Sequence, residues 1–296
     1  MIRLLLTAVI LSASFLLSAQ PADSVKTNWA TKGGVGFNFS QVGLTNWAGG
    51  GENSLALTGL YNQSFIYTKD IWTWDNSLDL AYGIIQQGDK PTRKSDDKLY
   101  LNSKLSRQFA EQWSFTGIMD FRTQFTDGFK YSLNAATNDE IATLISRFMS
   151  PAYLTTSIGL QYKPDEKLTV FVTPLTGKIT FVLDDTLASV GAYGVDKGKN
   201  SKMEFGSYVV TEYNTPIFEN VTLKSKLTLF SDYSHITLID VNWENLILFD
   251  INKYMKASFT TNLVYDDDIT VTRNNGTVGK DVQFKEVIAI GVSYAF

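Results

Sequence analysis

The residues that could do acid–base or nucleophilic chemistry are few and far apart. The chain of 296 residues has a single histidine, His235, in "SDYSHIT", and no cysteine. A serine nucleophile needs a histidine that is held by a third group, and no such motif surrounds His235, so we interpret it as a solvated loop residue. Asp75 and Asp79 could form a carboxylate pair, or they could line the polar interior of the β-barrel that the strand pattern described below predicts. We therefore expect a protein that is not an enzyme, with no catalytic residue and no cofactor.

Two further stretches resemble ligand-binding motifs. "PLTGKIT" fails as a phosphate loop, because Val172 stands where the motif needs glycine and Ile179 follows Lys178 in place of Ser or Thr. "YDDDIT" places Asp266, Asp267 and Asp268 together, and carboxylate oxygens are ligands that Ca²⁺ prefers. The stretch lacks the spacing and glycine of an EF-hand loop, so we assign no metal site, and calcium binding stays an open alternative to solvated loop carboxylates.

The elements that carry these residues show a period of two. In "WTWDNSLDLAYGI" the residues Trp72, Trp74, Leu78 and Leu80 share one parity, and small or polar residues share the other. Such alternation is typical of a strand with one apolar and one polar face. The same pattern recurs along the chain and predicts twelve strands, over 33–45, 54–67, 71–84, 97–109, 112–125, 151–163, 167–182, 202–214, 221–232, 239–250, 254–266 and 282–296. In the seventh, the apolar parity switches across Pro174 and Gly177, which indicates a bulge.

The connections alternate between short turns and long loops. Short turns are expected near 68–70, 111, 164–167, 214–220 and 252–253. Long loops are expected over 46–53, 85–96, 126–150, 183–201, 233–238 and 267–281, with a short helical pattern in "NDEIATLISRF". Aromatic residues gather at the short-turn ends of the apolar faces, at Tyr67, Trp72, Trp74, Trp113, Tyr162, Tyr213, Phe249, Tyr294 and Phe296. Together these features predict an all-β, closed antiparallel transmembrane β-barrel over 33–296, in place of a soluble β-sandwich.

The first residues predict where in the cell the protein is located. Arg3, an apolar run of about 14 residues and "LSA" before Gln20 are typical of a secretory signal peptide over 1–19. Residues 20–32 would then form a short periplasmic segment. Without Arg3, 25 basic and 30 acidic residues remain, and their signs are interspersed, which does not indicate a nucleic-acid partner. The expected location is the bacterial outer membrane, with its lipid as the main partner.

The polar parity predicts which side chains face the lumen. Acidic and basic residues are mixed there, which favours salt bridges over a strongly ion-selective pore. The predicted lumen residues are Asp75, Asp79, Asp120, Arg122, Lys104, Lys224, Lys226, Glu204, Glu212, Glu244 and Lys256. Loop residues expected to cap the barrel mouth, or to contact a ligand or partner, are Trp47, Gly49, Gly50, Gly51, Glu52 and Asn53 in "NWAGGGENS". Asp266, Asp267 and Asp268 are expected where a strand enters another long loop.

Several long stretches resemble a known family. "FSQVGLTNWAGGGENS", "WDNSLDLAYGIIQQGDKPTRKSDDKL", "PAYLTTSIGLQYKPDEKLTVFVTPLTGKIT", "VNWENLI" and "LVYDDDI" resemble a Bacteroidota outer-membrane family known only as domain of unknown function 3078. The resemblance covers essentially the whole chain after the signal peptide. It implies an outer-membrane location and supplies no activity or catalytic residue.

The last strand resembles the signal that the barrel-assembly machinery reads. Gly291, Tyr294 and Phe296 stand at its spacing, although Ala289 replaces the usual polar residue. Two functions remain open for the whole chain. The first is a small channel or passive transporter of unknown substrate. The alternative is a non-conducting accessory or structural subunit of a larger outer-membrane complex for assembly, secretion or nutrient uptake, with other outer-membrane proteins as partners.

Overall fold

A computed structural model describes residues 27–44, 52–134, 137, 139–269, 271–273 and 277–296. The predicted signal peptide, together with Trp47, Gly49, Gly50 and Gly51, lies outside the described residues. Among the described residues, no helix has the length and apolar character needed to cross a membrane.

Twelve antiparallel strands close into a barrel. They are β1 (Trp29–Val42), β2 (Ser54–Lys69), β3 (Trp72–Gln87), β4 (Arg93–Ala110), β5 (Trp113–Thr123), β8 (Ala152–Tyr162), β9 (Leu168–Phe181), β10 (Ser201–Phe218), β11 (Val221–Asp232), β12 (Asp240–Asp250), β13 (Met255–Tyr265) and β16 (Gln283–Ala295). Each pairs with its neighbours in this order, and β16 pairs with β1, so the sheet has no free edge. The predicted twelve-stranded antiparallel barrel is confirmed.

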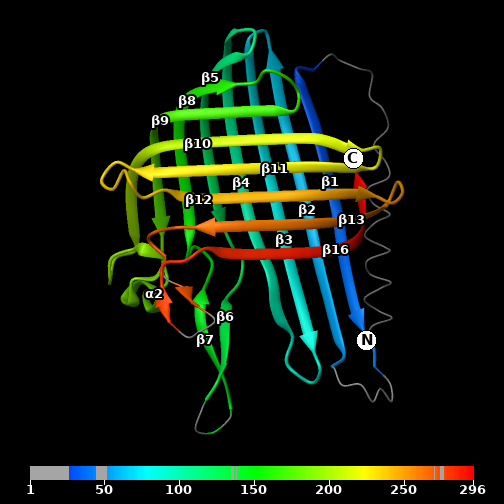
Figure 1. Ribbon diagram of the computed structural model, residues 1–296, viewed down its shortest axis with the longest axis vertical. Coiled ribbons are helices and arrows are strands. Elements are labelled where there is room, and N and C mark those ends of the chain that lie inside the picture. Colours follow the sequence, from blue (N-terminus) through cyan, green and yellow to red (C-terminus); the bar gives the residue numbers. More distant parts are fainter. Residues whose placement is uncertain (1–26, 45–51, 135–136, 138, 270, 274–276) are drawn as a thin grey trace.

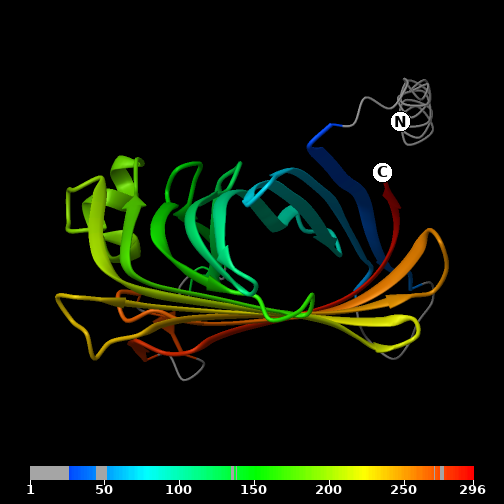
Figure 2. The same ribbon diagram turned by 90° about the horizontal axis from the view of Figure 1, so that it is seen from above.

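The strands of opposite walls cross one another. Strands β1 to β5 run steeply down one wall, while β10 to β13 and β16 run across the other (Figure 1). Seen from above, the two walls form opposed layers that join at their sides (Figure 2). Such crossing follows from the tilt that strands adopt when a sheet closes into a barrel.

The predicted bulge in the seventh barrel strand is present in β9. The pairing with β10 shifts between Gly206 and Tyr208, whose partners are Thr176 and Thr173. Pro174 therefore lies at the irregular point, where a residue without a backbone N–H costs no ladder hydrogen bond. The bulge explains why the apolar parity switches along this strand.

The connections differ from the prediction in two places. Residues 140–146 were expected to be helical, but they form β7 (Glu140–Ser146), which pairs with β6 (Gly128–Leu133) as a hairpin beyond the barrel. This prediction was wrong, because Ile141, Thr143 and Ile145 also fit a strand and the hairpin partner decides between the two periods. The loop expected over 85–96 is shorter, because β3 and β4 extend to Gln87 and Arg93.

Two further long loops contain small elements. The β9–β10 loop holds α2 (Asp185–Val190) and a 3₁₀ turn, η2 (Ala192–Gly194). The β13–β16 loop holds the two-residue strands β14 (Val271–Thr272) and β15 (Val278–Gly279). Helix α2 and the β6–β7 hairpin lie at the same end of the barrel (Figure 1).

Candidate functional site

The barrel places polar side chains inside and apolar side chains outside. On β5, Phe115 and Met119 are 53% and 51% exposed, whereas Thr116 between them is 1% exposed. Inward hydroxyls bond to each other across strands, as Ser157 and Thr176 do at 2.9 Å. This arrangement is the reverse of a water-soluble protein, in which the buried side of a sheet is apolar.

Aromatic side chains join into a belt on the outer face at the short-turn end. The Trp29 ring lies 5.1 Å from that of Tyr67 and 5.9 Å from that of Trp74, measured between centroids. On β5 and β8, the Trp113 and Tyr162 rings are 4.7 Å apart. Tryptophan and tyrosine with one apolar and one polar edge suit the boundary between lipid and water.

A central cluster of polar side chains reaches across the lumen. Asp120 on β5 accepts hydrogen bonds from the Tyr100 hydroxyl at 2.5 Å and from the Asn102 amide at 2.6 Å. Lys226 on β11 pairs with Glu212 at 3.3 Å, and its ammonium lies 5.8 Å from the centre of the Tyr100 ring. Four strands separate β11 from β4 along the shorter way round the barrel. The contact therefore bridges opposite walls.

Apolar side chains fill the lumen beside this central cluster. Phe171, Tyr208, Val210 and Phe230, from β9 to β11, are all between 2% and 9% exposed, and Ile118 of β5 packs against them. Strands β9 to β11 thus enclose the part of the interior that holds the central cluster. In this part of the barrel, side chains fill the lumen from one wall to the other.

A second charged group, the mouth cluster, lies towards the long-loop end. Lys178 on β9 is 2.8 Å from Asp240, 3.6 Å from Glu204 and 3.9 Å from Asp266. Lys202 on β10 contacts Glu204 at 3.4 Å and also contacts Asp268. Two lysines thus hold four carboxylates that come from β10, β12 and the segment after β13, which ties the loop end of this wall together.

The three consecutive aspartates do not converge on one point. Asp266, Asp267 and Asp268 contact three different lysines, Lys178, Lys280 and Lys202. Within the part of the chain that the structure describes, no three His, Cys, Asp or Glu side chains gather as a metal site would require. Burial raises the pKa of Asp266, and the nearby Asp240 raises it further, against the opposing effect of Lys178.

The opposite side of the lumen is in contact with solvent. Leu60 on β2 and Val287 on β16 share the inward parity, yet they are 38% and 40% exposed. Asp75 and Asp79 lie on the same side, half-buried on β3, and four residues along a strand place their Cα atoms about 13 Å apart. That spacing does not form a carboxylate pair. The side between β1, β2 and β16 therefore remains an open, water-accessible part of the interior.

The remaining predicted lumen residues lie apart from these clusters. The guanidinium of Arg122 is 5.3 Å from the centre of the Tyr153 ring, and Glu244 accepts a hydrogen bond from Asn242 at 3.0 Å. Lys256 pairs with Asp250 at the short-turn end. Lys104 is half-buried and Lys224 is exposed.

At the loop end, an arginine joins two loops. The Arg147 guanidinium donates to both oxygens of Asp127 at 2.8 Å and to Asp184, the N-cap of α2, at 2.7 Å. The hydrogen bonds from Arg147 lower the pKa of Asp127 below its usual 3.8. His235 is exposed in the turn after β11, and its backbone N–H donates to the Asp232 carbonyl.

The described part of "NWAGGGENS" closes the base of its own loop. The Asn53 side chain accepts from the Leu44 N–H at 2.6 Å, and its backbone carbonyl accepts from the Gly88 N–H at 2.7 Å. Glu52 lies 3.8 Å from Lys90 in the neighbouring loop. These residues hold the first two long loops together.

Sequence reasoning missed several residues that shape the lumen. Phe171, Tyr208 and Phe230 stand on the polar parity and so break the alternation, which was the available signal. Lys178 was considered only as part of a rejected phosphate loop, because the bulge in β9 hides its inward direction. The closure of the sheet determines which side chains meet across the barrel. A local sequence pattern does not predict these contacts.

Three solved structures illustrate what the barrel is similar to. They are an outer membrane channel from Pseudomonas putida F1 (12% identity over 94% of this chain and 100% of that chain, TM-score 0.42), the translocator domain of the autotransporter NalP from Neisseria meningitidis (11%, 98% and 95%, TM-score 0.38) and the toluene transporter TodX of P. putida (12%, 94% and 80%, TM-score 0.34). Among curated proteins, no sequence matches the chain. Residues 39–129 match the family described as "Protein of unknown function (DUF3078)", which confirms the resemblance to that family over this part of the chain.

Proposed function

We propose that the protein is an integral outer-membrane barrel that acts as a narrow channel or passive transporter for small solutes. The distribution of side chains supports the membrane setting. A water-soluble monomer rarely exposes a continuous apolar patch above a few hundred Å², whereas here large apolar residues face outwards on every wall of the barrel, for example Phe37, Leu57, Leu101, Phe115, Val172, Trp243 and Ile290.

The exposure of inward residues on one side carries the channel proposal. Leu60 and Val287 face the interior and remain more than a third exposed, while Phe171 on the other side is 2% exposed. Water can therefore enter the lumen beside β1, β2 and β16, although side chains fill it beside β9 to β11. A passage limited to one side of a twelve-stranded barrel suits small solutes and excludes folded or bulky ones.

Conductance across a planar bilayer tests this proposal. The purified protein is expected to give discrete current steps, and Leu60→Trp is expected to lower them, because an indole would enter the open side of the lumen. Leu57→Trp is the matched control, since Leu57 lies on the same strand with its side chain outside and 42% exposed. A wild-type barrel that inserts and stays silent would contradict the channel.

The cross-lumen contacts favour one second function. Side chains bridge the barrel where Lys226 meets Tyr100, and a fully bridged barrel would serve as a non-conducting accessory subunit of a larger outer-membrane complex. Silence in the bilayer together with stoichiometric co-purification of other outer-membrane proteins would support that role.

A further inference from the structure

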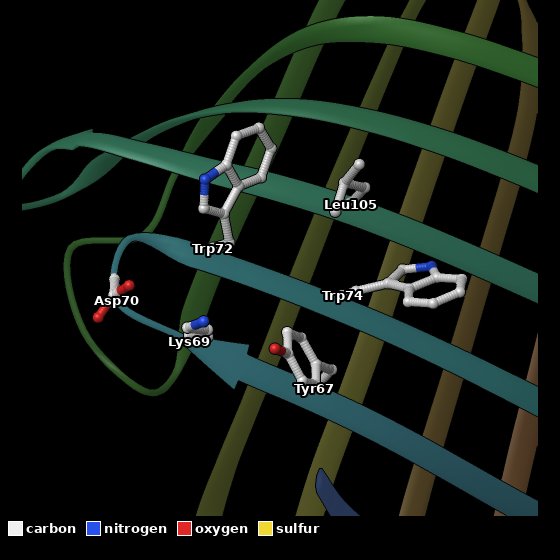
Figure 3. Close-up of a pocket in the computed structure, with 6 residues that line it drawn as sticks. All are labelled: Tyr67, Lys69, Asp70, Trp72, Trp74 and Leu105. Carbon is white, nitrogen blue, oxygen red and sulfur yellow. The ribbon is translucent and has the colours of Figure 1, made fainter. Parts of the chain in front are cut away.

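The outer surface at the short-turn end has a pocket that no part of the channel proposal uses. It has a volume of about 440 Å³ and is lined by Tyr67, Lys69, Asp70, Trp72, Trp74 and Leu105. Figure 3 shows these residues on β2, β3 and β4 and on the turn between β2 and β3. The volume lies within the range of small-molecule sites. The pocket opens outwards, so its occupant must come from the surroundings of the barrel.

The strand register orders the lining into two rows. Lys69 and Trp72 are direct cross-strand partners in the row nearest the turn, and Arg107, which lies beside the pocket and does not line it, is the next partner of Trp72 in that row. Tyr67, Trp74 and Leu105 are partners in the next row, further into the apolar belt. Charge thus lies towards the water and aromatic or aliphatic surface towards the lipid, in the order in which a phospholipid presents its headgroup and its chains.

The charged side chains in the row nearest the turn are available to a ligand. The Arg107 guanidinium lies 5.8 Å from the centre of the Trp72 ring. Among the described residues, no salt bridge engages Lys69, Asp70 or Arg107, and all three are exposed. Neighbouring strands are ~4.8 Å apart, so Lys69 and Arg107 are about 10 Å apart across Trp72, and a phosphate above that ring is within reach of both long side chains.

Asp70 adds the opposite charge at the edge of the pocket. It occupies the turn with a φ of 53°, and Figure 3 shows its carboxylate beyond Lys69, on the side away from Trp74. A ligand with a phosphate and an ammonium a few bonds apart would place the phosphate at Lys69 and Arg107 and the ammonium at Asp70.

We propose that this pocket binds the headgroup of a phosphoethanolamine lipid from the periplasmic leaflet of the outer membrane. The inference rests on the proposed membrane setting, which places the short-turn end at the periplasmic boundary. The Trp72 and Trp74 rings, 43% and 42% exposed, cover the glycerol and upper chains, and Leu105 lies beside Trp74. The charges select a zwitterionic headgroup over a purely anionic one.

Native mass spectrometry of the full-length protein released from nanodiscs tests the site, with phosphatidylethanolamine and phosphatidylglycerol as the two probes. The wild-type protein is expected to retain one phosphatidylethanolamine in preference to phosphatidylglycerol. The double variant Lys69→Gln, Arg107→Gln is expected to lose retention of both lipids. Asp70→Asn is expected to lose the preference alone, and asparagine tolerates the left-handed turn as well as aspartate does.

The control variant is Lys253→Gln, which removes a cation beside an aromatic ring, Tyr254, in another short turn. It should retain the lipid as the wild type does. Equal retention by wild type and the Lys69/Arg107 double variant, or no preference between the two lipids in the wild type, would overturn the site. Failure of the wild type to enter nanodiscs would instead contradict the membrane proposal, so the two failures are distinguishable.

Discussion

At the scale of residues, Lys178 is the charge on which most of the mouth cluster depends. Its side chain is 14% exposed, and the carboxylates that it contacts, on Glu204, Asp240 and Asp266, are between 4% and 22% exposed. Low exposure strengthens attraction and repulsion alike, because little water screens the charges. The cation therefore offsets a repulsion among three carboxylates as well as forming one pair.

Replacing this lysine should destabilise the barrel strongly. We expect Lys178→Met to lower the free energy of unfolding by about 3–5 kcal/mol, because it removes the lysine partner of Asp240 and Asp266 and leaves Glu204 with Lys202 alone. Urea unfolding in detergent, followed by tryptophan fluorescence, measures the change. The control is Lys163→Met, whose side chain is 43% exposed and pairs with Glu166, 93% exposed; it should change stability by less than about 1 kcal/mol. Equal effects of the two variants would contradict this account of the cluster.

At the scale of elements, the seam between β1 and β16 closes the barrel with few residues. It pairs only Gly34 to Asn38 with Gly291 to Ala295, and Phe296 extends it through two backbone hydrogen bonds with Gly33, at 2.8 and 2.9 Å. A Cβ on Gly33 would lie 2.6 Å from the Phe296 ring, and one on Gly291 would lie 2.5 Å from the Phe37 carbonyl oxygen. Gly291 is thus needed for the close approach of the two strands, because its contact is with backbone, whereas at Gly33 the Phe296 ring would have to shift.

This geometry gives Phe296 a direct part in closure, in addition to the proposed recognition by the assembly machinery. Deleting Phe296 should reduce the folded fraction in detergent or lipid, because two backbone bonds and a ring packed on Gly33 are lost. Ile288→Ala is the control, since Ile288 lies on the same strand, faces outwards and is 79% exposed. The folded fraction is read from the heat-sensitive mobility of the barrel on denaturing gels. An unchanged folded fraction without Phe296 would show that the seam does not need it.

The sequence pattern predicted an element correctly where its apolar residues fitted only the strand period of two. It predicted the wrong element where the apolar residues also fitted the helical period of 3.6. All twelve barrel strands follow from alternation, and the β9 bulge follows from Pro174 within a parity switch. In β7, Ile141, Leu144 and Ile145 also fit a helical spacing, and only pairing with β6 settles the structure. The pairing of Lys226 with Glu212 could be guessed from parity, but its contact with Tyr100 could not, because that contact depends on which walls face each other after closure.

At the scale of the whole molecule, the barrel has a polar interior and an apolar outer face, which is the arrangement of a barrel surrounded by lipid. Adjacent residues on β16 separate the two environments: Val287 faces the lumen and Ile288 faces outwards, and both are well exposed at 40% and 79%. In water, cysteines at these two positions would react alike. In a bilayer, only the lumen position would meet water.

The chain has no cysteine, so a maleimide reacts only with the cysteine that a single substitution introduces. The deciding measurement is the labelling rate of Val287→Cys and Ile288→Cys by a water-soluble maleimide after reconstitution into lipid vesicles, with denatured protein as the control for full reaction. Val287→Cys is expected to react, and Ile288→Cys is expected to be protected until the protein is unfolded. Equal labelling of the two cysteines in the vesicles would contradict this expectation.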